Sequence, residues 1–533
     1  MNHKSLLIPL AGGALAAAGC TDNRPNIIYV FPDQFRNSAM AFWNEKPYSG
    51  YVGWTADPVH TPNLDNFASE SAVFSHAMSN CPLSSPYRGI FLTGMYPQRS
   101  GVTLNCMAQR PFSSVRTDVK GLSDVLADNG YFCGYIGKLH ADCPTPNDPE
   151  NPGHYVSDRD PEWDAYTPKE RRHGYKWWYS YGTFDEHKNP HYWDTEGHRH
   201  APHEFSVKHE VDKAIEFLQE RDRHDRSIFH RRKPFLLSVA FNPPHSPYSG
   251  PEDCMEEDYN LYKDKSLKEL YVRENADTTL EKAPSIRYYF ANVTAVDREF
   301  GRLLAALKEY GMDKNTIVVF TSDHGETMCS HSTSDPKNSI WTESFNVPFI
   351  IRYPGKIRPR VDDSLFGTVD ITPTLLGLAG LGDKIPSTAE GMDISDEILE
   401  LPGEHETPGS ILYIRNVNGK TDSNGVVKDW FPEARGIKTG QYTYEVTVDR
   451  SYNLVRTLLY DDKNDPYQMH NITAEENPML HYRLTSILDK KLQETDDTWA
   501  QQSILRKVPG YREKQIIEEL YKRRRRGIHG KMR

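Results

Sequence analysis

The chain is organised around one segment, Ser84-Ser85-Pro86-Tyr87-Arg88-Gly89-Ile90-Phe91-Leu92-Thr93-Gly94. Serine is among the residues preferred at a helix N-cap. Proline is favoured in the first turn, because its fixed φ suits a helix and its missing N–H is not needed there. Taken as local structure, the segment predicts a helix with Ser84 as its cap and Pro86 in its first turn. A catalytic role for the same residues is compatible with that helix.

The segment resembles the signature of the type I sulfatases of the alkaline-phosphatase superfamily. In that signature a Ser or Cys is followed by Pro two residues later, by Arg four residues later, and then by Leu-Thr-Gly. Ser84 stands at the nucleophile position in this register. Cys81 is a competing candidate, but Leu83 and Ser85 stand where the signature has Pro and Arg. We therefore expect Ser84 to be the nucleophile position.

The resemblance implies that Ser84 is oxidised after synthesis to formylglycine by a serine-type maturase. The aldehyde hydrates to a diol, of which one hydroxyl attacks sulfur. The second then expels sulfate, so no stable serine sulfate has to be hydrolysed. Tyr87 departs from the pattern, because the family most often has Ser or Ala at this position, which helps the maturase recognise its target.

Oxygen-bearing side chains follow two strand-like runs, 27–31 and 316–320. Open α/β sheets place ligand sites beyond the carboxyl ends of such strands. An isolated Asp here would more simply cap the next element. The resemblance implies instead a cation site, and oxygen donors suit calcium, which one nitrogen ligand does not exclude. The implied ligands are Asp33, Gln34, Ser84, Asp323 and His324.

Two further strand-like runs, 130–140 and 233–241, carry or precede basic side chains. Lys138 and His140 are two residues apart, so an extended chain presents both on one side. Without the other motifs they would be an exposed Lys and a surface His. The resemblance implies that Lys138 bridges the nucleophile and the sulfate, and that His140 contacts the diol.

Three more residues take roles from the resemblance alone. Arg88 would orient the diol. His245, in Pro244-His245-Ser246-Pro247, would protonate the leaving alcohol. Lys337 would bind the sulfate oxygens together with Lys138.

The segment 171–200 is rich in aromatic residues and histidines and poor in aliphatic ones. One interpretation is a functional loop system that stacks on sugar rings and binds their hydroxyl groups. The alternative is a well-packed aromatic insertion that covers the sheet. On the first interpretation the substrate-binding residues are Asp185, His187, His191 and Trp193.

The first twenty residues contain an apolar run too short to span a bilayer, and they end in Ala18-Gly19-Cys20. We expect residues 1–20 to be a lipoprotein signal peptide, with Cys20 as a possible lipid anchor. The protein would then be exported to the periplasm or to the outer membrane and cell surface. A mean hydropathy of −0.69 predicts no transmembrane helix, and a net charge of −11 argues against a nucleic-acid partner.

The predicted fold is an alkaline-phosphatase-like α/β domain, residues 21–402, with a large mixed β-sheet flanked by helices. A smaller C-terminal α+β domain, residues 403–533, would contain an antiparallel sheet. The expected function is calcium-dependent hydrolysis of sulfate esters on a carbohydrate, a sulfated oligosaccharide bound in a pocket at a terminal or near-terminal residue. The alternatives are a phosphodiesterase or phosphonate hydrolase of the same superfamily, and a catalytically silent glycan-binding surface lipoprotein.

Overall fold

A computed structural model describes most of the 533-residue chain. The described residues are 24–107, 110–144, 149–154, 164, 166–225, 233–421, 427–508 and 511. The expected signal peptide, Cys20 and the basic run 522–526 lie outside these residues. No helix in the described part is both long enough and apolar enough to cross a membrane.

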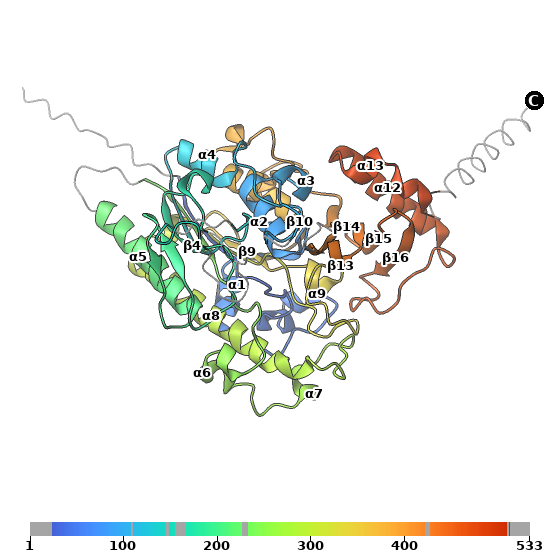
Figure 1. Cartoon of the computed structure of the whole chain (residues 1–533), viewed down its shortest axis with the longest axis horizontal. Coiled ribbons are helices and arrows are strands. Elements are labelled where there is room, and N and C mark those ends of the chain that lie inside the picture. Colours follow the sequence, from blue (N-terminus) through green and yellow to red (C-terminus); the bar gives the residue numbers. More distant parts are fainter. Residues whose placement is uncertain are drawn as a thin grey trace, which may run out of the picture.

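A ten-stranded mixed sheet forms the centre of the molecule (Figure 1). Its strand order is β10-β2-β9-β8-β1-β7-β3-β4-β5-β6. The strands are β1 (Asn26–Val30), β2 (Ala72–Met78), β3 (Phe132–Lys138), β4 (Trp177–Tyr181), β5 (Tyr192–Asp194), β6 (Arg199–His200), β7 (Phe235–Ala240), β8 (Thr316–Thr321), β9 (Phe349–Arg352) and β10 (Arg360–Gly367). The five strands β8, β1, β7, β3 and β4 run parallel, so their carboxyl ends lie at one edge. The expected mixed sheet is confirmed.

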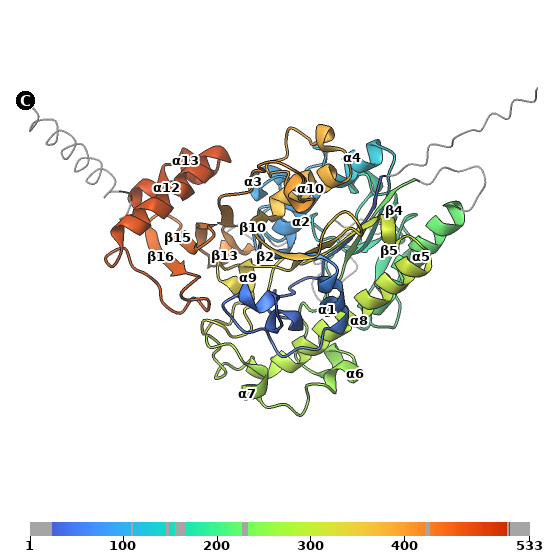
Figure 2. The same ribbon diagram turned by 180° about the vertical axis from the view of Figure 1, so that it is seen from behind.

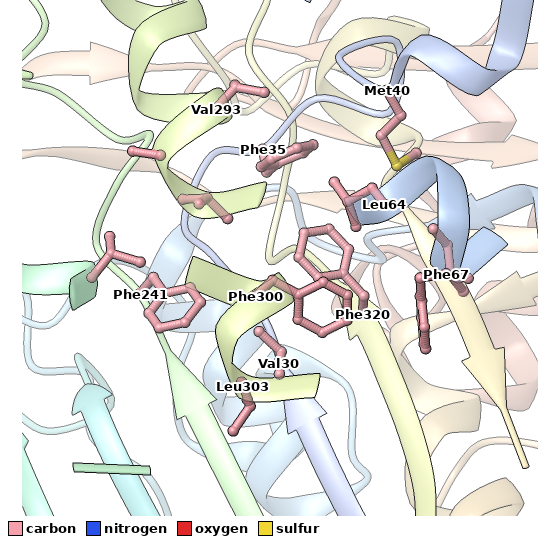
Figure 3. Packing of buried hydrophobic residues seen from close by; sticks show 14 of the residues in the cluster. Val30, Phe35, Met40, Leu64, Phe67, Phe241, Val293, Phe300, Leu303 and Phe320 are labelled. Carbon is pink, nitrogen blue, oxygen red and sulfur yellow. The ribbon is translucent and has the colours of Figure 1, made fainter. Parts of the chain in front are cut away.

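Helices cover both faces of this sheet, because side chains of the central strands alternate between two cores. Ile28 and Val30 of β1 face one core, together with α1 (Pro62–Ser69), α5 (Ser206–Asp225) and α8 (Ile286–Glu309). Figure 3 shows part of this cluster. Ile27 and Tyr29 face the other core, with α2 (Ser84–Thr93), α4 (Leu122–Asp128) and α10 (Ile371–Leu378). Figure 2 shows the two helical layers on opposite sides of the sheet.

A second, four-stranded antiparallel sheet lies in the C-terminal part, in the order β11-β14-β15-β16. Its strands are β11 (Ile411–Arg415), β14 (Glu433–Lys438), β15 (Tyr442–Val448) and β16 (Leu454–Asp461). Two helices, α12 (Pro478–Glu494) and α13 (Thr498–Gln501), pack against it, and β12 (Asn418–Thr421) pairs with β13 (Val427–Phe431). The smaller antiparallel unit is therefore as expected. The core of this unit also includes Leu83 and Ile90, so the C-terminal sheet and helices pack against the α2 segment.

Short helices complete the described structure. They are α3 (Pro97–Ser100), α6 (Glu256–Tyr259), α7 (Leu267–Leu270), α9 (Thr342–Phe345) and α11 (Ser395–Ile398).

Candidate active site

The parallel strands bring the candidate residues together at one edge of the sheet. Asp33 and Gln34 follow β1, His140 follows β3, His245 follows β7, and Asp323 with His324 follows β8. Lys138 is the last residue of β3. Because all four strands point the same way, side chains up to almost 300 positions apart in sequence converge on one site.

Ser84 is the first residue of α2, and Leu83 occupies the cap position. Ser84 is therefore not the N-cap that the sequence pattern predicts. Its hydroxyl oxygen lies 3.0 Å from Nε2 of His324, 3.3 Å from Oδ1 of Asp33 and 3.3 Å from Nζ of Lys337. The side chain is thus directed at the candidate cation ligands and at one of the two lysines.

The residues expected to hold a cation form a buried cluster. Ligand atoms of Asp33, Asp323 and His324 all lie within 4.8 Å of one another. Nδ1 of His324 is 2.9 Å from the carbonyl oxygen of Gly325, which leaves Nε2 with its lone pair toward the cluster. Burial, followed by the positive charge of Lys337, lowers the pKa of His324 well below its usual value, so the ring is neutral.

Two features of this cluster fit a bound cation. Burial and the neighbouring Asp33 raise the pKa of Asp323 to about 7, since two close carboxylates repel each other. Among the described residues, Oε1 of Gln34 has no hydrogen-bond partner although it is buried. Gln34 adjoins Asp33 in sequence, and its backbone N–H donates to Oδ1 of Asp323. An unpaired amide oxygen on this residue, together with two carboxylates and an imidazole nitrogen, is a donor set suited to a hard cation such as calcium.

Two buried basic side chains, Arg88 and Lys138, hold the two carboxylates in place. Arg88 lies 3.2 Å from Asp33 and 3.2 Å from Asp323, one nitrogen reaching both. Lys138 Nζ lies 2.8 Å from Oδ2 of Asp33 and 3.0 Å from Oδ1 of Asn242. Burial opposes ionisation of Asp33, but the positive side chains around it, Lys138 first, hold its pKa well below its usual value. Asp33 is therefore ionised.

His245 and Lys337 are half-buried and contact each other, whereas Asp33, Asp323 and His324 are buried. The Lys337 ammonium donates to Nε2 of His245 at 2.9 Å, while Nδ1 of His245 is 2.8 Å from the carbonyl oxygen of Ser246. Burial and then Lys337 hold the pKa of His245 well below its usual value. In this arrangement Nε2 of His245 is a neutral acceptor, and negative charge brought to Nε2 would favour its protonation.

His140 has a left-handed backbone, with φ of 42°, and its side chain is buried. Both of its ring nitrogens lack a hydrogen-bond partner among the described residues. Buried polar atoms are normally paired, so an unpaired imidazole beside the site is poised to bind a group that comes into it.

The four predicted sugar-binding residues divide into two pairs. Asp185 lies beside the site, with Oδ1 3.5 Å from Nδ1 of His245 and 3.4 Å from Nδ2 of Asn242. His187 is buried nearby, and its Nδ1 is 2.9 Å from the carbonyl oxygen of Asp253. This contact ties the segment after β4 to the loop that carries His245.

The other two residues require a correction. Trp193 is 1% exposed and belongs to a core cluster with Tyr179, Tyr181 and Tyr192. His191 is 2% exposed and pairs with the buried Asp164. Neither side chain offers a free face to a sugar ring. The aromatic content of this segment therefore reflects packing of β4 and β5 against α5, the alternative that the sequence left open.

Sequence reasoning assigned no role to two residues of the site. Asn242 lies two residues after the end of β7, much as Asp33 follows β1, and its amide connects Lys138 with Asp185. Glu326 is fully buried and accepts a hydrogen bond from the amide of Gln34. Asn242 could have been found from its position at a strand end, whereas no sequence pattern distinguishes Glu326 from a surface carboxylate.

Comparison with protein families gives two matches. The family model described as Sulfatase matches residues 25–381, and a model described as N-sulphoglucosamine sulphohydrolase, C-terminal, matches residues 331–498. The first covers the ten-stranded sheet and all the candidate residues, and the second includes the four-stranded sheet.

Individual proteins resemble the chain over most of its length. An endo-4-O-sulfatase of Bacteroides thetaiotaomicron is 55% identical over 482 residues, which cover 90% of this chain and 94% of the relative. A ulvan-active sulfatase of Formosa agariphila is 31% identical, over 89% of this chain and 82% of the relative. A solved B. thetaiotaomicron structure, described under the metabolism of multiple glycosaminoglycans, has a TM-score of 0.87 and 54% identity, over 91% of this chain and 100% of that one.

Proposed function

The chain belongs to the sulfatase family, and on that premise we propose that it hydrolyses 4-O-sulfate esters within a sulfated glycan. The observation that carries the chemistry is the position of the Ser84 hydroxyl, which lies between His324, Asp33 and Lys337. A nucleophile in contact with both a cation cluster and a lysine suits attack on an anionic ester.

We further propose that Ser84 is converted to formylglycine by a serine-type maturase and that calcium is the cation. Asp33, Gln34, Asp323 and His324, with the converted side chain, would hold the cation. It would supply charge against a sulfate oxygen and lower the pKa of the attacking hydroxyl. The hydrated aldehyde would supply that hydroxyl and a second one for release of sulfate.

The remaining polar side chains orient the reactants. Arg88 is held rigidly by Asp33 and Asp323, so it can orient the converted Ser84 without reorganisation. Lys138 ends β3, whereas Lys337 lies in the segment between β8 and α9, and the two would bind the sulfate oxygens together. His140 would bind the diol through a ring nitrogen that has no other partner among the described residues.

His245 is the proposed general acid. A sulfate group bound by Lys337 would bring negative charge to Nε2 of His245 in place of the ammonium contact. Such a charge raises the pKa of an imidazole and favours its protonated form. The proton on Nε2 would then pass to the oxygen of the leaving alcohol.

The substrate proposal rests on the relatives. The endo-4-O-sulfatase is more than half identical over nearly the whole of both chains, and the solved structure concerns glycosaminoglycan metabolism. These similarities favour an internal sulfate of a glycosaminoglycan-type chain over the terminal residue that the pocket argument predicts. Asp185, which borders His245, is the residue we propose to bind a hydroxyl group of the sulfated sugar.

We also propose that the protein is an exported lipoprotein anchored at Cys20. The motif preceding Cys20 and the polymeric nature of the proposed substrate support this location. A polymer too large to enter the cell has to be met outside it.

The function is tested with protein made together with a serine-type maturase. Intact mass should show the loss of two hydrogens at Ser84. The matured enzyme should then release sulfate from 4-O-sulfated oligosaccharides and leave 2-O- and 6-O-sulfated ones intact. Ser84→Ala should release none. Sulfate release from aryl sulfates alone would exclude the glycan assignment and keep the sulfatase chemistry. Efficient cleavage of phosphodiesters or phosphonates, with none of sulfates, would favour the other enzyme class.

A further inference from the structure

The side-chain amide of Gln34 has one satisfied end and one unsatisfied end. Its Nε2 donates to Oε2 of Glu326 and lies 3.3 Å from the hydroxyl of Tyr248. Its Oε1 is buried without a hydrogen-bond partner among the described residues. The orientation of the amide therefore decides whether an oxygen or an NH₂ group is the end left without a partner.

The backbone of Gln34 is fixed independently of this amide. Its φ is 66°, in the left-handed region. Its N–H donates to Oδ1 of Asp323 at 3.0 Å, and its carbonyl oxygen accepts from the hydroxyl of Tyr289 at 2.8 Å. The main remaining freedom of the residue is rotation of its side chain, including the exchange of the amide oxygen and nitrogen.

Glu326 removes that freedom, because a carboxylate accepts hydrogen bonds and cannot donate them. Its Oε2 also accepts from the hydroxyl of Tyr248 at 2.8 Å, and its Oε1 accepts from the N–H of Met328 at 2.9 Å. Lys282 lies 3.7 Å from Oε1. Both oxygens of Glu326 are held on this side as acceptors, so the reversed amide would place its own oxygen against an acceptor oxygen. The reversed orientation is therefore unfavourable.

We propose that Glu326 is a positioning residue for the cation site, which sets the amide of Gln34 so that Oε1 serves as a ligand. Glu326 is not itself one of the clustered ligands, which among the described residues are Asp33, Asp323 and His324. It acts through Gln34. This inference rests on the proposed calcium site, and outer-shell residues of this kind typically change metal affinity by about 10–100-fold.

The test measures calcium binding and not turnover. Protein made without a maturase keeps Ser84 as serine, and isothermal titration calorimetry gives its calcium Kd. Glu326→Leu should raise that Kd about 10–100-fold, and Glu326→Gln, which keeps one acceptor oxygen, should raise it less. Lys282→Met is the matched control, since it alters the other carboxylate oxygen without touching Gln34, and its Kd should stay within about twofold of wild type.

A double-mutant cycle separates positioning from general disruption. In a Gln34→Ala background the ligand is already lost, so adding Glu326→Gln should change the calcium Kd no further. If the two effects multiply, Glu326 does not act through Gln34. An unchanged Kd in both Glu326 variants would also overturn the proposal. Failure of wild-type protein to bind calcium at all would instead overturn the proposed cation. The melting temperature of each variant without calcium identifies any that fails to fold, and Glu326→Gln then decides alone.

Discussion

Nζ of Lys337 lies 2.9 Å from Nε2 of His245, and this contact joins the segment after β8 to the loop after β7. The ammonium is the donor, so Nε2 carries no proton in the free site. Burial is the largest cause of the low pKa of His245, and the positive charge of Lys337 is the next largest. A sulfate group that binds Lys337 would therefore also raise the pKa of the His245 imidazole and favour its protonated form.

The first prediction concerns the leaving group. Changing His245 to Ala should lower kcat/KM on a sulfated sugar by about 10²–10⁴-fold, because an alkoxide leaves poorly without a proton. The loss on a nitrophenyl sulfate should be much smaller, since that group leaves as a stable anion. Steady-state kinetics on both substrates measure the difference. Equal losses on the two substrates would remove His245 from the acid role.

The second prediction concerns the ionisation of His245. Lys337→Met should raise the pKa of the imidazole, because a positive neighbour disfavours the imidazolium form. NMR titration of selectively labelled histidine, with His245→Gln used to assign the signal, measures the shift. Lys314→Met, at an exposed position outside the site, serves as the control. A pKa that stays unchanged or falls in Lys337→Met would show that the contact at 2.9 Å is not maintained in solution.

Part of this site could be expected from the sequence, because Asp33, Asp323 and His245 each follow a strand-like apolar run and the ends of parallel strands converge at one edge. The roles expected for these residues came from the family resemblance. Trp193 was misassigned because an aromatic residue in a polar segment is compatible both with sugar stacking and with packing. Its burial depends on pairing with β4 and on packing against Tyr166, which no local pattern contains.

The third prediction concerns the cation. Asp323→Asn should abolish turnover, since it removes a charged ligand from the cluster and a partner of Arg88. Treatment of wild-type enzyme with a chelator should also stop turnover, and calcium should restore it, because oxygen donors predominate and no thiolate is present in the cluster. Atomic absorption of the purified protein gives the metal content. Restoration by zinc and not by calcium would show that the assignment of the ion is wrong.

The fourth prediction concerns a buried network next to the site. Glu343 lies 2.6 Å from Arg273 and 2.8 Å from Asn275. Glu343→Ala leaves the guanidinium of Arg273 buried and unpaired, so we expect a loss of about 3–5 kcal/mol in the free energy of unfolding. Urea denaturation measures it. Glu400→Ala, which breaks an exposed pair with Arg358, is the control and should leave the unfolding midpoint unchanged.

The difference in free energy of unfolding between wild type and Glu343→Ala depends on pH, and its direction follows from the pKa of Glu343. Burial opposes ionisation of Glu343, but Arg273 and His331 outweigh it and hold its pKa well below the ordinary value of 4.5. The unfolded chain therefore binds this proton first as the pH falls. The stabilisation by Glu343 is fully present above about pH 4.5 and is lost at lower pH, as the folded group titrates. The gap between wild type and Glu343→Ala should stay constant from neutral pH to about pH 5 and shrink below it. A gap that widens in acid would contradict the assignment.

The last prediction concerns where the enzyme acts along a glycan. Similarity to an endo-4-O-sulfatase favours action on internal sulfates, whereas the proposed clamp of Lys138, Lys337 and His245 would surround the sulfate group closely. The two are compatible if the clamp holds only the sulfate and the sugar chain passes across the mouth of the site. On that view a 4-O-sulfated octasaccharide should lose its internal sulfates as readily as its terminal one, and chain length should change KM more than kcat. Mass spectrometry of partial digests locates each sulfate that is lost. Stepwise loss that begins only at one end would show that the site accepts termini alone.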